Sequence, residues 1–222
     1  MNLQRGQISQ PKLKEILCNI SQHAPKPNKV RIIAVTKTFD ISTIQSAIKN
    51  KIFLIGENKV QETKQKLLKY TKPQELSIHM IGHLQKNKAK QAVELYDVIE
   101  SVDTIKIAKA INQAAEKKQK QQKIFIQIKI SNNTNHKGVA PEKAKKLILE
   151  ILKLKNINTR GIMAIGPKTK NIQRINRAYK KISKLQKKLQ KETRTNLKEP
   201  SLGMSSDYIY ALKQGATLIR IG

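Results

Sequence analysis

Short apolar runs rich in β-branched residues alternate along the chain with longer stretches in which apolar residues recur at helical spacing among lysines. Apolar runs of about four to eight residues are typical of strands buried on both faces, and the longer amphipathic stretches are typical of helices that cover a sheet. The repeated order of strand and helix predicts βα units and a parallel sheet.

The pattern predicts eight strands and eight helices. The expected strands are residues 30–36, 52–55, 77–81, 98–102, 124–130, 159–164, 201–204 and 217–221. The expected helices are residues 7–22, 41–49, 59–69, 84–95, 104–116, 141–152, 172–191 and 208–214, the first of which precedes the first strand. An α/β fold of this kind fits a single (β/α)8 barrel of the TIM type with an extra N-terminal helix, forming one domain over residues 1–222.

Several expected helices begin at residues that suit a helix N-terminus. Asp40 or Ser42 at one helix, Asp103 or Thr104 at another and Asp207 at a third can accept hydrogen bonds from the unpaired N–H groups of a first turn. Pro141 has no N–H to leave unpaired there. These residues support the helix starts that the apolar spacing indicates.

Composition narrows the class of protein. No run approaches the roughly 18 apolar residues that a membrane helix needs, and the N-terminus lacks the apolar region of a signal peptide. We therefore expect a soluble, cytoplasmic protein with no membrane partner. The single cysteine, Cys18, lies among apolar residues of the first expected helix, so we expect it in the core and not as a nucleophile.

The net charge of +30 raises the question of a phosphate-backbone partner. Lysines run along almost every expected helix, however, and aromatic residues make up only 4% of the chain, so no stacking surface is indicated. The excess is mostly lysine, with many isoleucines and asparagines, which is typical of proteins from AT-rich genomes. We expect no specific nucleic-acid partner, and a basic nucleic-acid-binding barrel is the third of three interpretations.

A lysine closes the first expected strand, because Lys37 follows directly on residues 30–36. At the mouth of a barrel such a lysine would be desolvated, which favours the neutral amine that attacks an aldehyde. Lys37 is therefore a candidate for a Schiff base. From this strand alone, a lysine that extends its amine into solvent is the simpler interpretation.

Polar residues also mark the second and third expected strands. Asn58 follows the second strand and His79 lies within the third, where an amide and an imidazole could donate or accept hydrogen bonds at the barrel mouth. The alternatives are an ordinary helix cap at Glu57 or Asn58 and a hydrogen-bonded core histidine at His79.

The last two strands carry the remaining candidates. The turn at residues 201–207 contains glycine and serines and opens a helix, which suits a phosphate, and the loops after the seventh and eighth strands form the usual phosphate site of such barrels. Arg220 lies within an otherwise apolar strand. A buried arginine keeps its charge, so a ligand or an internal carboxylate must be nearby.

Together these segments resemble the YggS/PROSC family of pyridoxal phosphate homeostasis proteins, which is related to the N-terminal barrel of alanine racemase. The matching stretches occur in family order over nearly the whole chain. They are AVTKT (34–38), GENKVQE (56–62), HMIGHLQKNK (79–88), QIKIS (127–131), HKGV (136–139), RGIMAI (160–165), SLGMSSD (201–207) and RIG (220–222).

The resemblance implies that pyridoxal 5′-phosphate (PLP) is the cofactor and is bound as a Schiff base on Lys37. The cofactor-binding residues that it implies are Lys37, Asn58, His79, Met163, Ser201, Gly203, Met204, Ser205, Arg220 and Gly222. Ser205 and the backbone around Gly203, Met204 and Gly222 would hold the phosphate. Arg220 would face the pyridine nitrogen, where a permanent cation disfavours protonation and weakens PLP as an electron sink.

Two departures from the family pattern bear on the phosphate site. Chains of the family usually continue past Arg-Ile-Gly with a threonine that would contribute to this site, whereas this sequence ends at Gly222, which leaves the strength of PLP binding open. Ser206 stands where an aspartate is common, which is a milder change.

The favoured function is a PLP carrier in vitamin B6 homeostasis that has no catalytic residues and no metal, acts as a monomer and hands PLP to apo-enzymes. Racemases of the related fold take an opposing base from another domain, and we expect none after Gly222. The alternative is a PLP-dependent amino-acid racemase that draws its second acid or base from the barrel or from a partner subunit.

Overall fold

The computed structural model describes residues 6–68, 70–130 and 137–222. Its strands are β1 (Arg31–Val35), β2 (Leu54–Glu57), β3 (Ser77–Met80), β4 (Val98–Val102), β5 (Gln122–Ile128), β6 (Ile157–Ala164), β7 (Glu199–Met204) and β8 (Leu218–Ile221). Its helices are α1 (Gln10–His23), α2 (Ile41–Lys49), α3 (Val60–Leu67), α4 (Ala89–Leu95), α5 (Ile105–Lys117), α6 (Pro141–Ile151), α7 (Ile172–Thr193) and α8 (Tyr208–Lys213), with 3-10 turns η1 (Pro27–Lys29) and η2 (Lys86–Lys88).

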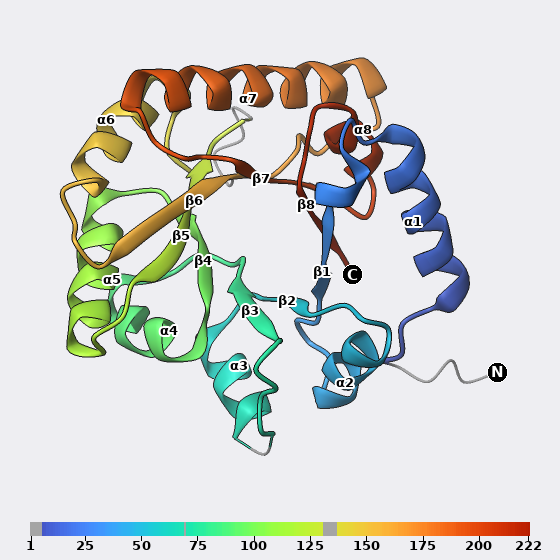
Figure 1. Ribbon diagram of the computed structural model, residues 1–222, viewed down its shortest axis with the longest axis horizontal. Helices are drawn as coiled ribbons and strands as arrows, with labels where there is room; N and C mark the ends of the chain where they lie inside the picture. Colours follow the sequence, from blue (N-terminus) through green and yellow to red (C-terminus); the bar gives the residue numbers. More distant parts are fainter. Residues whose placement is uncertain (1–5, 69, 131–136) are drawn as a thin grey trace.

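The strands close into one barrel, in which each strand pairs in parallel with its neighbours in chain order and β8 returns to β1. Figure 1 shows the helices around the outside, with the long α7 across the top of the view and α1 beside α8. Val35 pairs with Gly56 and Ala34 pairs with Ile221, so the carboxyl ends of β1, β2 and β8 meet at one mouth. The (β/α)8 barrel with an extra N-terminal helix is confirmed.

The helix starts follow the residues expected to cap them. At α2, the Asp40 side chain accepts a hydrogen bond from the backbone N–H of Ser42. At α5, Thr104 accepts one from the N–H of Ile107, and Pro141 occupies the first turn of α6. These caps satisfy donors that have no partner within the helix.

The core has one part inside the barrel and a larger part between the strands and the helices. Inside the barrel, Ile33, Val98, Phe125, Met163 and Leu218 pack on one another. The larger cluster joins the outward-facing strand residues to the helices. Both faces of the strands are covered, which explains why every residue of β4 is buried and why the strands have nearly continuous apolar sequences.

The expected start of the fourth helix and the expected burial of Cys18 were wrong. The helix expected over residues 84–95 becomes α-helical only at Ala89, because the backbone of Gln85 is still extended and a 3-10 turn follows it. Cys18 is exposed and not in the core. In α1 only Ile20 is buried, and Cys18 lies two residues away, roughly 200° around the helix, so it faces solvent. Lys69, expected to end the third helix, lies outside the described residues.

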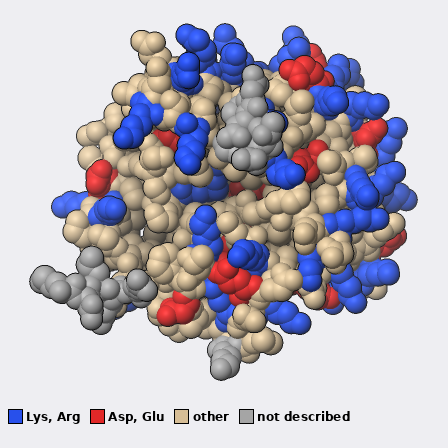
Figure 2. All heavy atoms as spheres, turned by 180° about the vertical axis from the view of Figure 1, so that it is seen from behind, with Lys and Arg blue, Asp and Glu red and all other residues tan. Residues whose placement is uncertain are grey.

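Basic side chains are distributed widely over the surface. Figure 2 shows lysines and arginines around much of the visible face, with acidic side chains between them. Within the described ranges, none of the helices is long and apolar enough to cross a bilayer.

Candidate functional site

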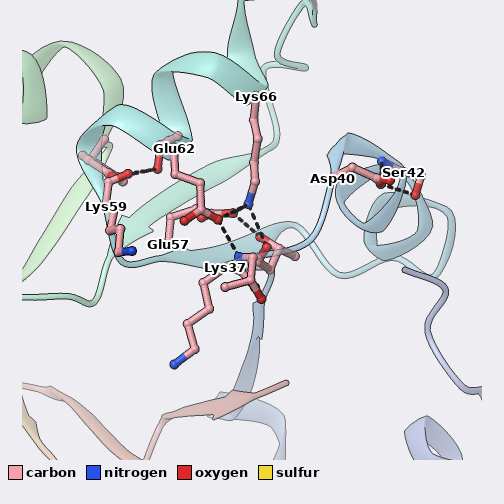
Figure 3. Close-up of polar contacts among 11 residues, drawn as sticks. Lys37, Asp40, Ser42, Glu57, Lys59, Glu62 and Lys66 are labelled. Carbon is pink, nitrogen blue, oxygen red and sulfur yellow. Dashed lines mark hydrogen bonds and ion pairs between the residues drawn. The ribbon is translucent and has the colours of Figure 1, made fainter. Parts of the chain in front are cut away.

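Lys37 lies at the barrel mouth, just beyond the end of β1. Its side chain is exposed, and Figure 3 shows the amine pointing away from the carboxylate of Glu57. The expectation of a desolvated lysine was therefore wrong, because burial ends at Thr36 and the chain turns there. An exposed amine at the mouth can be reached by a ligand from solvent.

Asn58 follows β2 and is half-buried against the loop that follows β3. A Cβ atom added to Gly82 in that loop would lie 2.2 Å from the carbonyl oxygen of Asn58. Only a glycine at position 82 allows the two backbones to approach this closely. Glu57 is not a helix cap, since it is fully buried at the end of β2 and Lys59 stands at the N-cap of α3.

His79 lies inside the barrel and is bonded to an acid that is not among the expected site residues. Its Nδ1 lies 2.6 Å from Oε1 of Glu100, which is fully buried on β4. Burial alone would raise the pKa of Glu100, but the hydrogen bond and charge of His79, the charge of Arg220 and the hydroxyl of Ser201 lower it overall. Because a carboxylate only accepts hydrogen bonds, Nδ1 of His79 carries the hydrogen of this contact.

Arg220 is buried and joined to the same carboxylate through Ser201. Its Nη1 donates to the carbonyl oxygen of Ser201 at 2.7 Å and to Oγ of Ser201 at 2.8 Å, and its Nη2 donates to the carbonyl oxygen of Ala164 at 2.8 Å. The Ser201 hydroxyl donates in turn to Oε2 of Glu100 at 2.6 Å. The internal carboxylate that a buried arginine requires is therefore Glu100.

One signal in the sequence could have identified Glu100. It is an ionisable residue in an otherwise mostly apolar expected strand, which is the same observation that drew attention to Arg220. A charged residue at such a position needs a partner, so the two belong together on grounds of burial alone.

Ser205 and Gly222 meet at the mouth, where β7 and β8 end. The Ser205 hydroxyl donates to the carbonyl oxygen of Gly222 at 3.1 Å and accepts from its N–H at 3.2 Å. Gly203 has a φ of +88°, which turns the chain before Ser205. The N–H of Met204 donates to Oδ1 of Asp207 at 2.6 Å, so this N–H is already occupied. Asp207 consequently makes no capping bond to α8.

The expected site residues thus form an inner and an outer level. His79, Ser201 and Arg220 are hydrogen-bonded through Glu100 inside the barrel, and Met163 is buried beside Ser201 on the neighbouring strand β6. Lys37, Asn58, Ser205 and Gly222 lie above them at the mouth. Ser131 and His136, which belong to two of the matching stretches, lie outside the described residues.

A closed parallel barrel with polar side chains at the carboxyl ends of its strands defines this chain as a (β/α)8-barrel protein with a candidate site at its mouth. The family described as "Alanine racemase, N-terminal domain" matches residues 8–222, and curated pyridoxal phosphate homeostasis proteins match over most of the chain. The chain belongs to this family, among its pyridoxal phosphate homeostasis proteins.

Three similar proteins show the extent of the match. The pyridoxal phosphate homeostasis protein of Synechocystis sp. is 34% identical over 199 residues, which are 90% of this chain and 91% of that protein. The protein of the same name from Buchnera aphidicola is 37% identical over 194 residues, 87% of this chain and 84% of that protein. The solved structure of PipY from Synechococcus elongatus with PLP bound is 30% identical, with a TM-score of 0.83 over 94% of this chain and 96% of its own.

Proposed function

We propose that this chain binds PLP as a Schiff base on Lys37 and serves PLP homeostasis. The observation that carries the proposal is the exposed amine of Lys37, at the mouth of the barrel and above a buried, hydrogen-bonded arginine. The similar PipY structure with PLP bound supports the choice of cofactor. The donors fit PLP by their chemistry, with an amine for the aldehyde, a hydroxyl and a backbone N–H for the phosphate, and a cation for the ring nitrogen.

Each candidate residue has a role in this proposal. Ser205 and the N–H of Gly222 hold the phosphate, because their mutual hydrogen bonds of 3.1 and 3.2 Å are near the long end of the normal range and are readily exchanged. The backbone at Gly203 and Met204 shapes this turn. The pocket around the ring is lined by Asn58, His79, Met163 and Ser201.

Arg220 favours a role for the protein without catalysis. Bound PLP supplies an electron sink when its ring nitrogen is protonated. Arg220 keeps its positive charge and is fixed by Ser201 and Ala164, so it opposes a second positive charge on a nitrogen that faces it. We therefore propose that the protein binds PLP without turnover, consistent with the name that its relatives carry.

Titration of the purified protein with one equivalent of PLP is expected to produce an imine absorbance band that borohydride removes. Mass spectrometry of the reduced, digested protein should then find the cofactor on the peptide that contains Lys37. One equivalent is used because the chain holds many surface lysines, some of which react at excess PLP. The absence of a band, or label spread over several lysine peptides, would contradict the proposal.

Amino-acid turnover separates the carrier from a PLP-dependent racemase. In deuterium oxide with PLP and L-alanine, the protein is expected to exchange the α-proton no faster than PLP alone, because a ring nitrogen beside Arg220 remains unprotonated. The measurement is proton NMR of the alanine α-position over hours. Sustained exchange that is lost on Lys37→Ala substitution would favour the racemase.

We propose a single PLP-binding domain over residues 1–222 that acts as a monomer in the cytoplasm, delivers PLP to apo-enzymes and has no specific nucleic-acid partner. The dispersed basic charge in Figure 2 supports the last point. Light scattering of the eluted protein tests the monomer, and activation of an added PLP-dependent apo-enzyme by the loaded protein tests delivery.

A further inference from the structure

The turn that carries Lys37 lies against three charged side chains of β2 and α3, here called the Lys66 cluster (Glu57, Glu62 and Lys66). The side chain of Glu57 is fully buried, and only 9% of the Lys66 side chain is exposed. The Lys66 ammonium lies 2.7 Å from Oε1 of Glu57 and 3.1 Å from Oε1 of Glu62. Figure 3 shows these groups gathered on one side of the turn.

The Lys66 cluster binds the backbone on both sides of Lys37. Before it, Nζ of Lys66 donates to the carbonyl oxygen of Thr36 at 2.8 Å, and the Thr36 hydroxyl donates to the carboxylate that ends β2 at 2.6 Å. After it, the N–H of Thr38 donates to Oε1 of Glu62. The two neighbours of Lys37 are therefore fixed, while its own side chain points away from the cluster (Figure 3).

The two lysines of this region have opposite surroundings. The three N–H groups of the Lys66 ammonium face three acceptors, namely the Thr36 carbonyl and the carboxylates of Glu57 and Glu62. Burial alone would raise the pKa of Glu62, but the N–H of Thr38 and the ammonium of Lys66 lower it below 4.5. Glu62 is therefore ionised at neutral pH, Lys66 is fully engaged, and Lys37 is the amine that is presented.

Barrel stability does not explain this arrangement. Thr38 has a φ of +67°, a conformation that residues with side chains rarely adopt. Burying charged groups costs desolvation energy that apolar packing would avoid, and Oε2 of Glu57 has no hydrogen-bond partner within the described part of the chain. The arrangement is explained if the cluster fixes the direction of the turn that carries Lys37. A strained turn persists where the surrounding contacts hold it for a function.

We propose that Lys66 is a positioning residue for Lys37, and that Glu57 and Glu62 hold it in place. The cluster fixes the turn so that the amine of Lys37 is presented at the mouth to the aldehyde of a phosphorylated ligand. This inference rests on the proposed function. Lys66 acts only through the backbone of Thr36 and the carboxylate that holds Thr38, and it touches neither ligand nor reacting atoms.

The test replaces the ammonium and keeps most of the side-chain volume. Lys66→Met is expected to weaken PLP binding by about tenfold, because a displaced amine no longer meets the aldehyde in the reactive geometry. It should also lower the ratio of imine to free-aldehyde absorbance at saturating PLP. Glu62→Ala removes the Thr38 anchor and one carboxylate on Lys66 but leaves the buried Glu57 paired with Lys66, so it should fold. It is expected to change both quantities in the same direction. Lys64→Met, an exposed lysine on the same helix, is the matched control and should bind as the wild type does.

Two further measurements need no PLP and separate this inference from the proposed function. The amide hydrogen of Thr38 should exchange faster in Lys66→Met and Glu62→Ala than in the wild type. Reductive methylation by formaldehyde labels both Lys37 and Lys64. The ratio of labelling at Lys37 to labelling at Lys64 should differ from the wild-type ratio in both variants. A wild type without an imine on Lys37 contradicts the proposed function, and these two measurements still test the positioning. If both variants showed the wild-type imine ratio, Thr38 exchange and labelling, the positioning role of Lys66 would be overturned, even if the variants melted at a lower temperature.

Discussion

Substitution of Lys37 by alanine is expected to abolish the imine absorbance that PLP gives with the wild-type protein. Retention of PLP through gel filtration should fall on the order of a hundredfold, because a covalent bond formed between groups already held together benefits from a high effective concentration. The side chain is exposed, so the thermal midpoint should remain within the small range typical of surface substitutions. Absorbance, gel filtration and thermal melting of the same preparations measure all three effects.

The matched control is Lys59→Ala, because Lys59 is an exposed lysine near the same mouth and is visible beside the Lys66 cluster in Figure 3. It should keep the imine band and the retained PLP of the wild type. If Lys37→Ala kept the band and Lys59→Ala lost it, the Schiff base would belong to Lys59. Loss of the band together with a large fall in the thermal midpoint would mean that the turn had unfolded and that Lys37 has a structural role.

The helices and strands could be predicted from the sequence where each face of the element has a clear packing partner. The bounds of α2 and β4 match the expected residues 41–49 and 98–102, because Asp40 caps the helix and the strand is buried throughout. The fifth strand was placed at residues 124–130 and begins instead at Gln122. The Gln122 side chain is buried and donates to the carbonyl oxygens of Tyr96 and Asp97, which polarity alone does not reveal.

Only part of the site could be predicted from the sequence, because its residues lie on strands that are far apart along the chain. Lys37 and Arg220 stand out as charged residues at or within apolar strands. Their surroundings depend on closure of the barrel, since Ser201 bonds to Glu100 across 101 positions of sequence. No local pattern gives the geometry of such a pair. The exposure of Lys37 depends likewise on where the turn leaves the barrel, which residue type does not determine.

Substitution of Glu100 by leucine is expected to lower the free energy of unfolding by about 3–5 kcal/mol, because it leaves the charge of Arg220 buried without a carboxylate. Arg220 would keep its bonds to the carbonyl oxygens of Ser201 and Ala164, which carry only partial charges. Denaturant melts monitored by circular dichroism measure the effect. Glu75→Leu, at an exposed position, is the control and should shift the free energy by no more than about 0.5 kcal/mol.

The charge of Glu100 and the volume of its side chain can be separated by pH and by a second substitution. The pKa of Glu100 is lowered in the folded protein, so its ionised form contributes stability that is present above 4.5 and is lost as pH falls through the folded-state value. The stability difference between wild type and Glu100→Gln should therefore be largest near neutral pH and narrow in acid. The double substitution Glu100→Leu with Arg220→Met should recover most of the loss, because replacing both charges removes the unpaired one. A single Glu100→Leu variant as stable as the wild type at neutral pH would show that hydrogen bonds to Ser201 and Ala164 suffice for Arg220 and that the carboxylate serves His79 alone.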